Sequence, residues 1–276
     1  MPENIAPDLY RNRDFIPDFD EIMAETAARS RALAAHAEMR ANIAYGPRPR
    51  ERMDLILPPN LKSGAPLHLF VHGGYWRAGC KEDHRLVAAP VLAAGGIAAI
   101  VGYDLMPATR LAVLVAQVRQ AMRHLVAMAP GFGADPARVT VSGHSAGAHL
   151  ASYLAAQGVG EPPPGLPTLR GMLLVSGIYD LSGIPGSFLK DEARMRPEEA
   201  AAWSPLDARH DPGPERVLTR GAAETAPFHD QAARMAALLP GSTLRCEPGL
   251  NHLSVVLALA DPGHALGRRL ADMVSG

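Results

Sequence analysis

Continuous apolar runs alternate with amphipathic stretches along most of the chain. Two of these runs, IAAIV at 97–101 and GMLLV at 171–175, have no polar position at all. Strands with this pattern are buried on both faces, as in parallel sheets. Amphipathic helical stretches lie between the runs, and the clearest covers 111–129. Parallel neighbours need such crossovers, so the alternation predicts an α/β fold with a mostly parallel central sheet and helices on both faces.

We expect residues 1–276 to form a single domain. Two segments within it do not follow the alternation of strands and helices. Residues 1–45 are rich in Ala, Glu and Arg around 22–43, which predicts a small helical N-terminal arm or cap. Its expected apolar face is formed by Ile22, Met23, Ala27, Leu33 and Ala37. A packing arm and a cap over an active site are both open interpretations. Residues 183–216 have no clear period and predict an irregular insertion over the active site.

The bulk composition excludes several classes of partner. The formal net charge is −1, which gives no electrostatic reason to expect a nucleic acid or an anionic membrane. No apolar run is long enough to cross a bilayer, and the polar N-terminus lacks the apolar core of a signal peptide. We therefore expect a cytoplasmic enzyme that binds neither membrane nor nucleic acid. A homodimer remains open.

The sequence Gly143-His144-Ser145-Ala146-Gly147 fits the G-x-S-x-G pattern of a nucleophile elbow. Apolar β-branched residues precede it and helix-forming residues follow it. A serine on such a strand-to-helix turn needs small neighbours, because other backbone must approach it closely. We predict that Ser145 is the nucleophile. The alternative is a glycine-flanked serine in an ordinary turn.

A second glycine motif predicts an oxyanion hole. An apolar strand ends in His72-Gly73-Gly74, and glycines allow backbone N–H groups to approach a substrate oxygen. The expected donors are the N–H groups of Gly73, Gly74 and Ala146. We expect His72 to hold this loop by hydrogen bonds.

The aromatic residues Tyr75 and Trp76 follow the glycines directly. They are either core residues or part of the substrate pocket. We count them, together with His144, as candidate pocket residues.

The base and the acid follow from chain order. In hydrolases that have a nucleophile elbow of this kind, the order along the chain is serine, acid, histidine. His252 stands in a loop after the last predicted strand. A serine hydroxyl needs such an imidazole to accept its proton. Glu224 is the first carboxylate after the penultimate strand and is the preferred acid; its rivals are Asp180, Asp207 and Asp230. No motif indicates a metal or a nucleotide, so we expect no cofactor.

Together these motifs resemble the kynurenine formamidase (arylformamidase) family within the esterase/lipase group. The resemblance extends from about Leu9 to His252. It includes HGGYW, GHSAG and the later segments Val101–Pro107, Ser176–Leu181 and Trp203-Ser204-Pro205.

The resemblance implies that Ser145 and His252 are catalytic. Gly221, Glu224, Phe228 and Gln231 keep the spacing found around the family's acid. That acid is usually Asp, so Glu224 is a departure. The family's Pro-Glu pair is absent, and Ala226-Pro227 stand in its place.

Three functions remain open. The leading hypothesis is a serine hydrolase that cleaves a small N-acyl substrate, such as N-formylkynurenine, through an acyl-enzyme intermediate. A carboxylesterase acting on small acyl or aryl esters would use the same residues. A hydrolase-fold protein that only binds a small ligand is the third.

Overall fold

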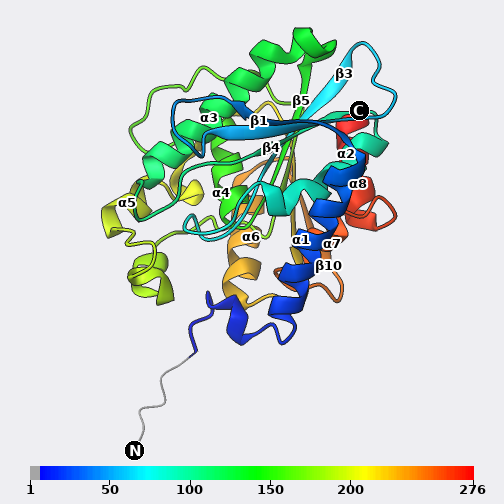
Figure 1. Ribbon diagram of the computed structural model, residues 1–276. Coiled ribbons are helices and arrows are strands. Elements are labelled where there is room, and N and C mark those ends of the chain that lie inside the picture. The colour runs from blue at the N-terminus through cyan, green and yellow to red at the C-terminus, as the bar shows by residue number, and fades with distance from the viewer. Residues whose placement is uncertain (1–6) are drawn as a thin grey trace, which may run out of the picture.

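The computed structural model describes residues 7–276, so the first six residues of the predicted N-terminal arm lie outside the described part of the chain. Eight strands form one sheet in the order β1-β2-β4-β3-β5-β7-β9-β10. The first two pairs, β1 with β2 and β2 with β4, are antiparallel, and all later neighbours are parallel. The predicted α/β fold with a mostly parallel sheet is confirmed (Figure 1).

The bounds of these eight strands are β1 Glu38–Ala44, β2 Arg52–Leu57, β3 Ala65–Val71, β4 Ile97–Val101, β5 Ala134–His144, β7 Gly171–Val175, β9 Glu215–Gly221 and β10 Thr243–Glu247. Two very short strands, β6 Ala156–Gln157 and β8 Arg209–His210, pair separately. The α-helices are α1 Phe19–His36, α2 Ala88–Ala93, α3 Leu111–Met128, α4 Ala146–Ser152, α5 Pro197–Ala202, α6 Ala226–Leu238, α7 Ser254–Leu259 and α8 Ala265–Ser275.

Helices cover both faces of the sheet, which explains the apolar runs. In β4, the side chains of Ile97, Ala99 and Val101 enter the core that contains residues of α3, α4 and α6. Those of Ala98 and Ile100 enter the opposite core, which contains residues of α2, α7 and α8. Successive residues of a strand point to opposite faces, so every side chain of β4 enters one of the two cores.

The N-terminal segment is only partly helical, so the helix predicted around 22–43 is wrong beyond His36. Residues 38–44 form the edge strand β1, which pairs with β2 and has an irregular register between Arg40 and Ile43. The backbone N–H of Asn42 donates to the Asp54 carboxylate at 2.8 Å. Pairing with the sheet satisfies these backbone groups, and this tertiary contact outweighs the helix propensity of the sequence.

The buried face of α1 also differs from the expected one. Ile22, Thr26 and Ser30 are buried, whereas Met23 is exposed. Ser30 Oγ donates to the Asp83 carbonyl oxygen at 2.7 Å, and Asp83 belongs to the 3-10 helix at Glu82–Val87. This hydrogen bond therefore holds α1 against the segment that follows the glycine loop.

The irregular segment 183–216 contains short elements. They are 3-10 helices at Ile184–Gly186, Phe188–Lys190 and Pro205–Asp207, the helix α5, the strand β8 and the first residues of β9. The final helix, expected from about Ser254, is divided into α7 and α8 by a turn at Asp261-Pro262-Gly263. None of the helices in residues 7–276 has the length and apolarity required to cross a membrane.

One histidine is fully enclosed between strands. The ring of His68 in β3 lies 2.9 Å from Thr140 Oγ1 and 2.7 Å from Ser142 Oγ, both in β5. Burial lowers the pKa of His68 to about 3. An unfolded-chain histidine binds a proton near pH 6.5, so between these pH values the unfolded state holds more protons. Stability contributed by neutral His68 is therefore lost as the pH falls.

We expect His68→Gln to weaken the dependence of stability on pH. Below about pH 5.5, His68 makes the free energy of unfolding fall by about 1.4 kcal/mol per pH unit. Urea unfolding of the variant at several pH values down to about pH 4 should show a slope smaller by that amount. His36 is exposed, so His36→Gln is the matched control and should keep the parent slope. Identical slopes in His68→Gln and the parent protein would contradict the expectation.

Candidate active site

Ser145 stands on a strained turn between β5 and α4. Its backbone has φ 56° and ψ −121°, a region that non-glycine residues rarely adopt. Its N–H donates to the Val175 carbonyl oxygen at 2.8 Å, which ties the turn to the end of β7. The hydroxyl lines a cavity although the residue is only 2% exposed.

The two glycines of the motif allow backbone to pack directly on backbone. A Cβ atom on Gly147 would lie 2.0 Å from the Val71 carbonyl oxygen and 2.4 Å from that of His72. A Cβ atom on Gly143 would lie 2.4 Å from the Gly147 carbonyl oxygen. The end of β3 and the first turn of α4 therefore touch, as the motif predicts.

His252 joins Ser145 to Glu224. Its Nε2 lies 2.9 Å from Ser145 Oγ, and its Nδ1 lies 2.7 Å from Glu224 Oε2. A carboxylate can only accept, so Nδ1 carries the proton in this bond, and Nε2 of the neutral ring accepts from the serine hydroxyl. The structure thus brings together the three residues that lie 107 and 28 positions apart along the chain.

Glu224 is held by more partners than the sequence indicated. Its other oxygen, Oε1, accepts from the Gly221 N–H at 2.6 Å and from Ser176 Oγ at 2.5 Å. Burial raises the pKa of the Glu224 carboxyl, but the charge of His252 and the hydrogen bonds from His252, Ser176 and Gly221 outweigh it and lower the pKa. The carboxylate is therefore kept ionised.

Ser176 has a role that the sequence analysis missed. It directly follows β7 and has a positive φ of 52°, which turns its hydroxyl toward Glu224. The only sequence signal was its place after a buried strand, in the Ser-Gly pair of a matched segment. The rival acids lie elsewhere: Asp180 pairs with Arg234 at 2.7 Å, and Asp230 is exposed on α6.

Two rings hold the imidazole of His252 in place. His144 Nε2 donates to the His252 carbonyl oxygen at 2.7 Å, and the Phe228 ring centroid lies 4.2 Å from that of His252. Burial, followed by the charge of His252, holds the pKa of His144 well below its usual value. His144 is therefore a neutral positioning residue, and it also lines the cavity.

The glycine loop lies directly beside Ser145. A Cβ atom on Gly73 would lie 3.2 Å from the Ser145 Cβ. Gly74 has a φ of 117°, and a Cβ atom there would lie 2.2 Å from the Ala78 carbonyl oxygen. Both glycines line the cavity. Ala146 is the first residue of α4, where N–H groups have no partner within the helix.

The residues around these glycines differ from expectation in one case. Tyr75 lines the cavity, but Trp76 does not. Trp76 is fully buried and its Nε1 donates to His149 Nδ1 at 3.1 Å, so it is a core residue and its expected place in the pocket is wrong. His72 Nδ1 lies 2.7 Å from the Gly73 carbonyl oxygen, and its ring stacks on Tyr103, as expected of a residue that holds the loop.

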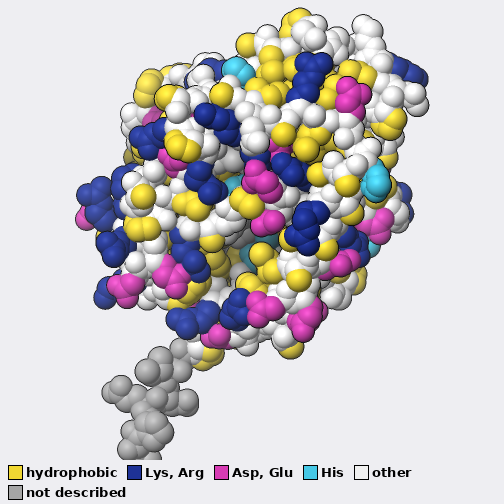
Figure 2. Space-filling model, viewed as in Figure 1, with side chains coloured by type: hydrophobic (Ala, Val, Ile, Leu, Met, Phe, Trp, Pro, Cys, Tyr) yellow, Lys and Arg dark blue, Asp and Glu magenta, His cyan; other side chains and the backbone are white. Residues whose placement is uncertain are grey.

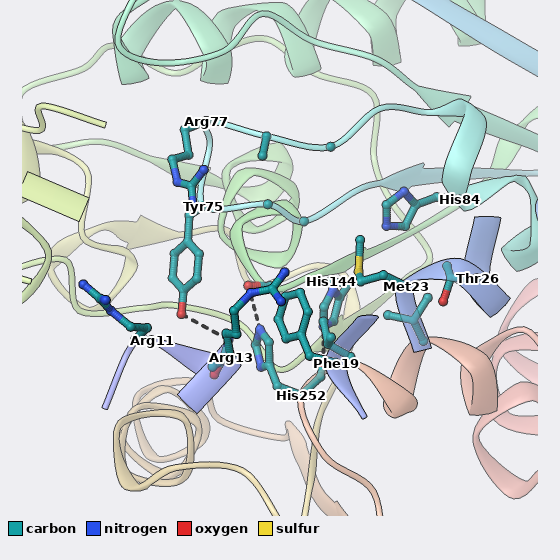
Figure 3. Close-up of a pocket in the computed structure, with 18 of the residues that line it drawn as sticks. Arg11, Arg13, Phe19, Met23, Thr26, Tyr75, Arg77, His84, His144 and His252 are labelled. Carbon is teal, nitrogen blue, oxygen red and sulfur yellow. Dashed lines mark hydrogen bonds between the residues drawn. The ribbon is translucent and has the colours of Figure 1, made fainter. Parts of the chain in front are cut away.

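The cavity has a volume of about 450 Å³ and is walled by segments that are distant in sequence. Asn12, Phe19 and Met23 from the N-terminal segment and Phe188 and Glu192 from the insertion all line it. Figure 2 shows that this face is hollowed and that basic and acidic side chains surround the hollow. In Figure 3, Tyr75 and Arg77 lie at one end of the cavity, and His84 and Met23 lie at the other. Residues of the N-terminal segment therefore form part of the cavity wall.

No group of His, Cys, Asp or Glu side chains within residues 7–276 could hold a metal ion. The polar groups that line the cavity are instead hydroxyls, imidazoles, the Asn12 amide and the backbone of the glycine loop, together with charged side chains. Such a set suits transfer of an acyl group.

Comparisons with known proteins find hydrolases similar to this chain. The BD-FAE family matches residues 53–161. Kynurenine formamidase of Salmo salar is 27% identical over 99% of this chain and 95% of its own length. A crystal structure from Silicibacter sp. TM1040, provisionally described as a thioesterase, has a TM-score of 0.83 and 27% identity, with 97% of this chain and 98% of that chain covered. An esterase of Pyrobaculum calidifontis shares the fold, with a TM-score of 0.72 and 18% identity over 94% of this chain and 93% of that chain. The chain therefore has the α/β-hydrolase fold and is similar to the kynurenine formamidases over almost its whole length.

Proposed function

We propose that the protein is a serine hydrolase that cleaves a small N-acyl substrate, a formamide or an amide, through an acyl-enzyme intermediate. The observation that carries this proposal is the continuous chain of hydrogen bonds from Glu224 through His252 to Ser145, which ends in the cavity beside the glycine loop. The likeness to kynurenine formamidase over almost the whole chain supports N-formylkynurenine as the first substrate to test.

The first half of the reaction forms the acyl-enzyme. Ser145 Oγ attacks the acyl carbon while His252 Nε2 takes the hydroxyl proton. The resulting imidazolium is stabilised by ionised Glu224, which also fixes the tautomer of the ring. The negative charge on the substrate oxygen is stabilised by the N–H groups of Ala146 and the glycine loop, which form the oxyanion hole. His252 then gives its proton to the leaving nitrogen as the bond to the acyl carbon breaks.

The second half releases the acyl group. A water molecule enters the space that the amine has left, and His252 removes a proton from it as it attacks the acyl carbon. The second tetrahedral intermediate collapses, the Ser145 oxygen recovers a proton from His252, and the carboxylic acid leaves. The same groups therefore serve both steps, with the imidazole alternating between base and acid.

A carboxylesterase acting on small acyl or aryl esters is the second candidate, favoured by the likeness in fold to the Pyrobaculum esterase. Both candidates use the same nucleophile and base. Turnover of N-formylkynurenine beside 4-nitrophenyl acetate separates them, and activity on the ester alone would favour the esterase.

We expect a fluorophosphonate probe to label Ser145 covalently, because its oxygen is activated by His252. Mass spectrometry of the digested protein should locate the label on the peptide containing residue 145. Ser145→Ala should remove both the label and at least about 10⁴-fold of kcat/KM. A folded parent protein that takes no label, and a variant with unchanged activity, would instead support a protein that only binds its ligand.

We expect Glu224→Gln to lower kcat by about 10³- to 10⁴-fold with the fold intact, because a neutral amide neither stabilises imidazolium nor selects its tautomer. Steady-state kinetics with circular dichroism as a folding check would measure this. Asp230→Asn is the matched control, since Asp230 is an exposed carboxylate on the next helix, and it should retain activity within about twofold. A larger loss from Asp230→Asn than from Glu224→Gln would refute the assignment of the acid.

A further inference from the structure

Residues 8–12 form a short segment, here called the N-terminal strap, that is bound to several elements around the cavity. Thr225, which follows Glu224 in sequence, donates from its Oγ1 to the Leu9 carbonyl oxygen at 2.7 Å. Gln231 Nε2 donates to the Tyr10 hydroxyl at 2.9 Å. The Phe188 N–H, from the insertion, donates to the Asp8 carboxylate. These bonds from α6, its preceding loop and the insertion fix the strap, so its side chains have defined positions at the site.

Asn12 is the strap residue that reaches the glycine loop. It is only 7% exposed, and its Nδ2 donates to the Tyr75 hydroxyl at 3.2 Å. That hydroxyl has a single proton, which it donates to the Tyr10 carbonyl oxygen. Its oxygen can therefore only accept from Asn12, so the amide must present its nitrogen to Tyr75.

This orientation leaves Oδ1 as the free polar atom of Asn12. Within residues 7–276 no donor bonds to it, and it is not among the side-chain atoms that are sealed off without a partner. Asn12 lines the cavity together with Ser145, Gly74 and His252. Figure 3 shows Tyr75 reaching from the glycine loop toward the end of the cavity where Arg11 and Arg13 lie. A mostly buried residue of the cavity wall thus has an accessible acceptor that no described donor occupies.

An acceptor at this position distinguishes two substrates that are otherwise alike. A secondary amide carries an N–H at its scissile bond, whereas an ester has an oxygen there. An enclosed acceptor that meets an N–H gains a hydrogen bond, but one that meets an ester oxygen stays unsatisfied, and this asymmetry is a strong source of discrimination.

We propose that Asn12 Oδ1 accepts a hydrogen bond from the N–H of the scissile amide and makes the enzyme selective for N-acyl over O-acyl substrates. This inference rests on the proposed serine hydrolase function and adds to it the residue that separates amide from ester. Tyr75 acts on the same contact as a positioning residue, because its hydroxyl holds the Asn12 amide in this orientation.

The test compares 4-nitroformanilide with 4-nitrophenyl formate, which differ only by N–H in place of oxygen, with spontaneous hydrolysis subtracted. Asn12→Leu keeps the size of the side chain and removes the acceptor. We expect it to lower kcat/KM at least about tenfold for the formanilide and less than about threefold for the formate. Asn12→Asp keeps an acceptor oxygen, and the Tyr75 hydroxyl can donate to its second oxygen, so this variant should retain the parent ratio of the two values within about threefold.

Tyr10→Phe is the matched control for a loosened strap, because it removes the bond from Gln231 but leaves Asn12 unchanged. It should change both substrates by the same factor. Equal losses for both substrates in Asn12→Leu would overturn the inference while leaving the serine hydrolase function in place. A parent protein that hydrolyses only the formate would also overturn it. Absence of turnover with either substrate, together with no labelling of Ser145, would overturn the proposed function itself.

Discussion

The site depends on one close contact between backbones, that of the last residues of β3 with the first turn of α4. Only glycine at position 147 allows it, since a Cβ atom would sit 2.0 Å from the Val71 carbonyl oxygen. This contact places the glycine loop that leaves β3 beside the serine that precedes α4. The distance between Ser145 and the backbone of the glycine loop is therefore set by the sheet and not by flexible side chains. The positive φ of Ser145 is maintained because its neighbours on both sides are packed in this way.

A second close contact aligns Glu224 with His252. A Cβ atom on Gly221 would lie 2.2 Å from the Leu250 carbonyl oxygen, and the Ala223 N–H donates to that same oxygen at 2.9 Å. The loop that carries Glu224 is thus bonded to the loop that carries His252. Within this frame the longer glutamate side chain reaches three donors at once, from Gly221, Ser176 and His252. Glu can therefore stand where the resembling family usually has Asp, because its longer side chain still places the carboxylate within hydrogen-bond distance of all three donors.

Sequence reasoning reached those parts of the molecule that local chemistry determines. The G-x-S-x-G turn, the H-G-G loop and the apolar strands each have a pattern that a backbone requirement imposes, and the structure brings Ser145, Glu224 and His252 together. Sequence reasoning failed where a contact between residues distant in the chain determines the local structure. Residues 38–44 favour a helix by composition, but β2 offers them a paired edge. Trp76 follows the glycines, yet a hydrogen bond to His149 draws it into the core. The local sequence does not reveal the roles of Ser176 and Asn12, because their partners lie 48 and 63 positions away.

The N-terminal segment shows why this second kind of residue matters for specificity. The groups that would perform acyl transfer occupy the ends of β3, β5, β9 and β10, which any hydrolase of this fold can supply. These groups treat an amide and an ester alike, since both present a carbonyl carbon and oxygen to the same atoms. Discrimination must come from a group on the leaving side of the scissile bond. In the binding mode that we propose, that side lies against the strap and the insertion, which add Asn12, Phe188 and Glu192 to the cavity. The sheet therefore determines which reaction is possible, and the segments laid over it determine which substrate can use it.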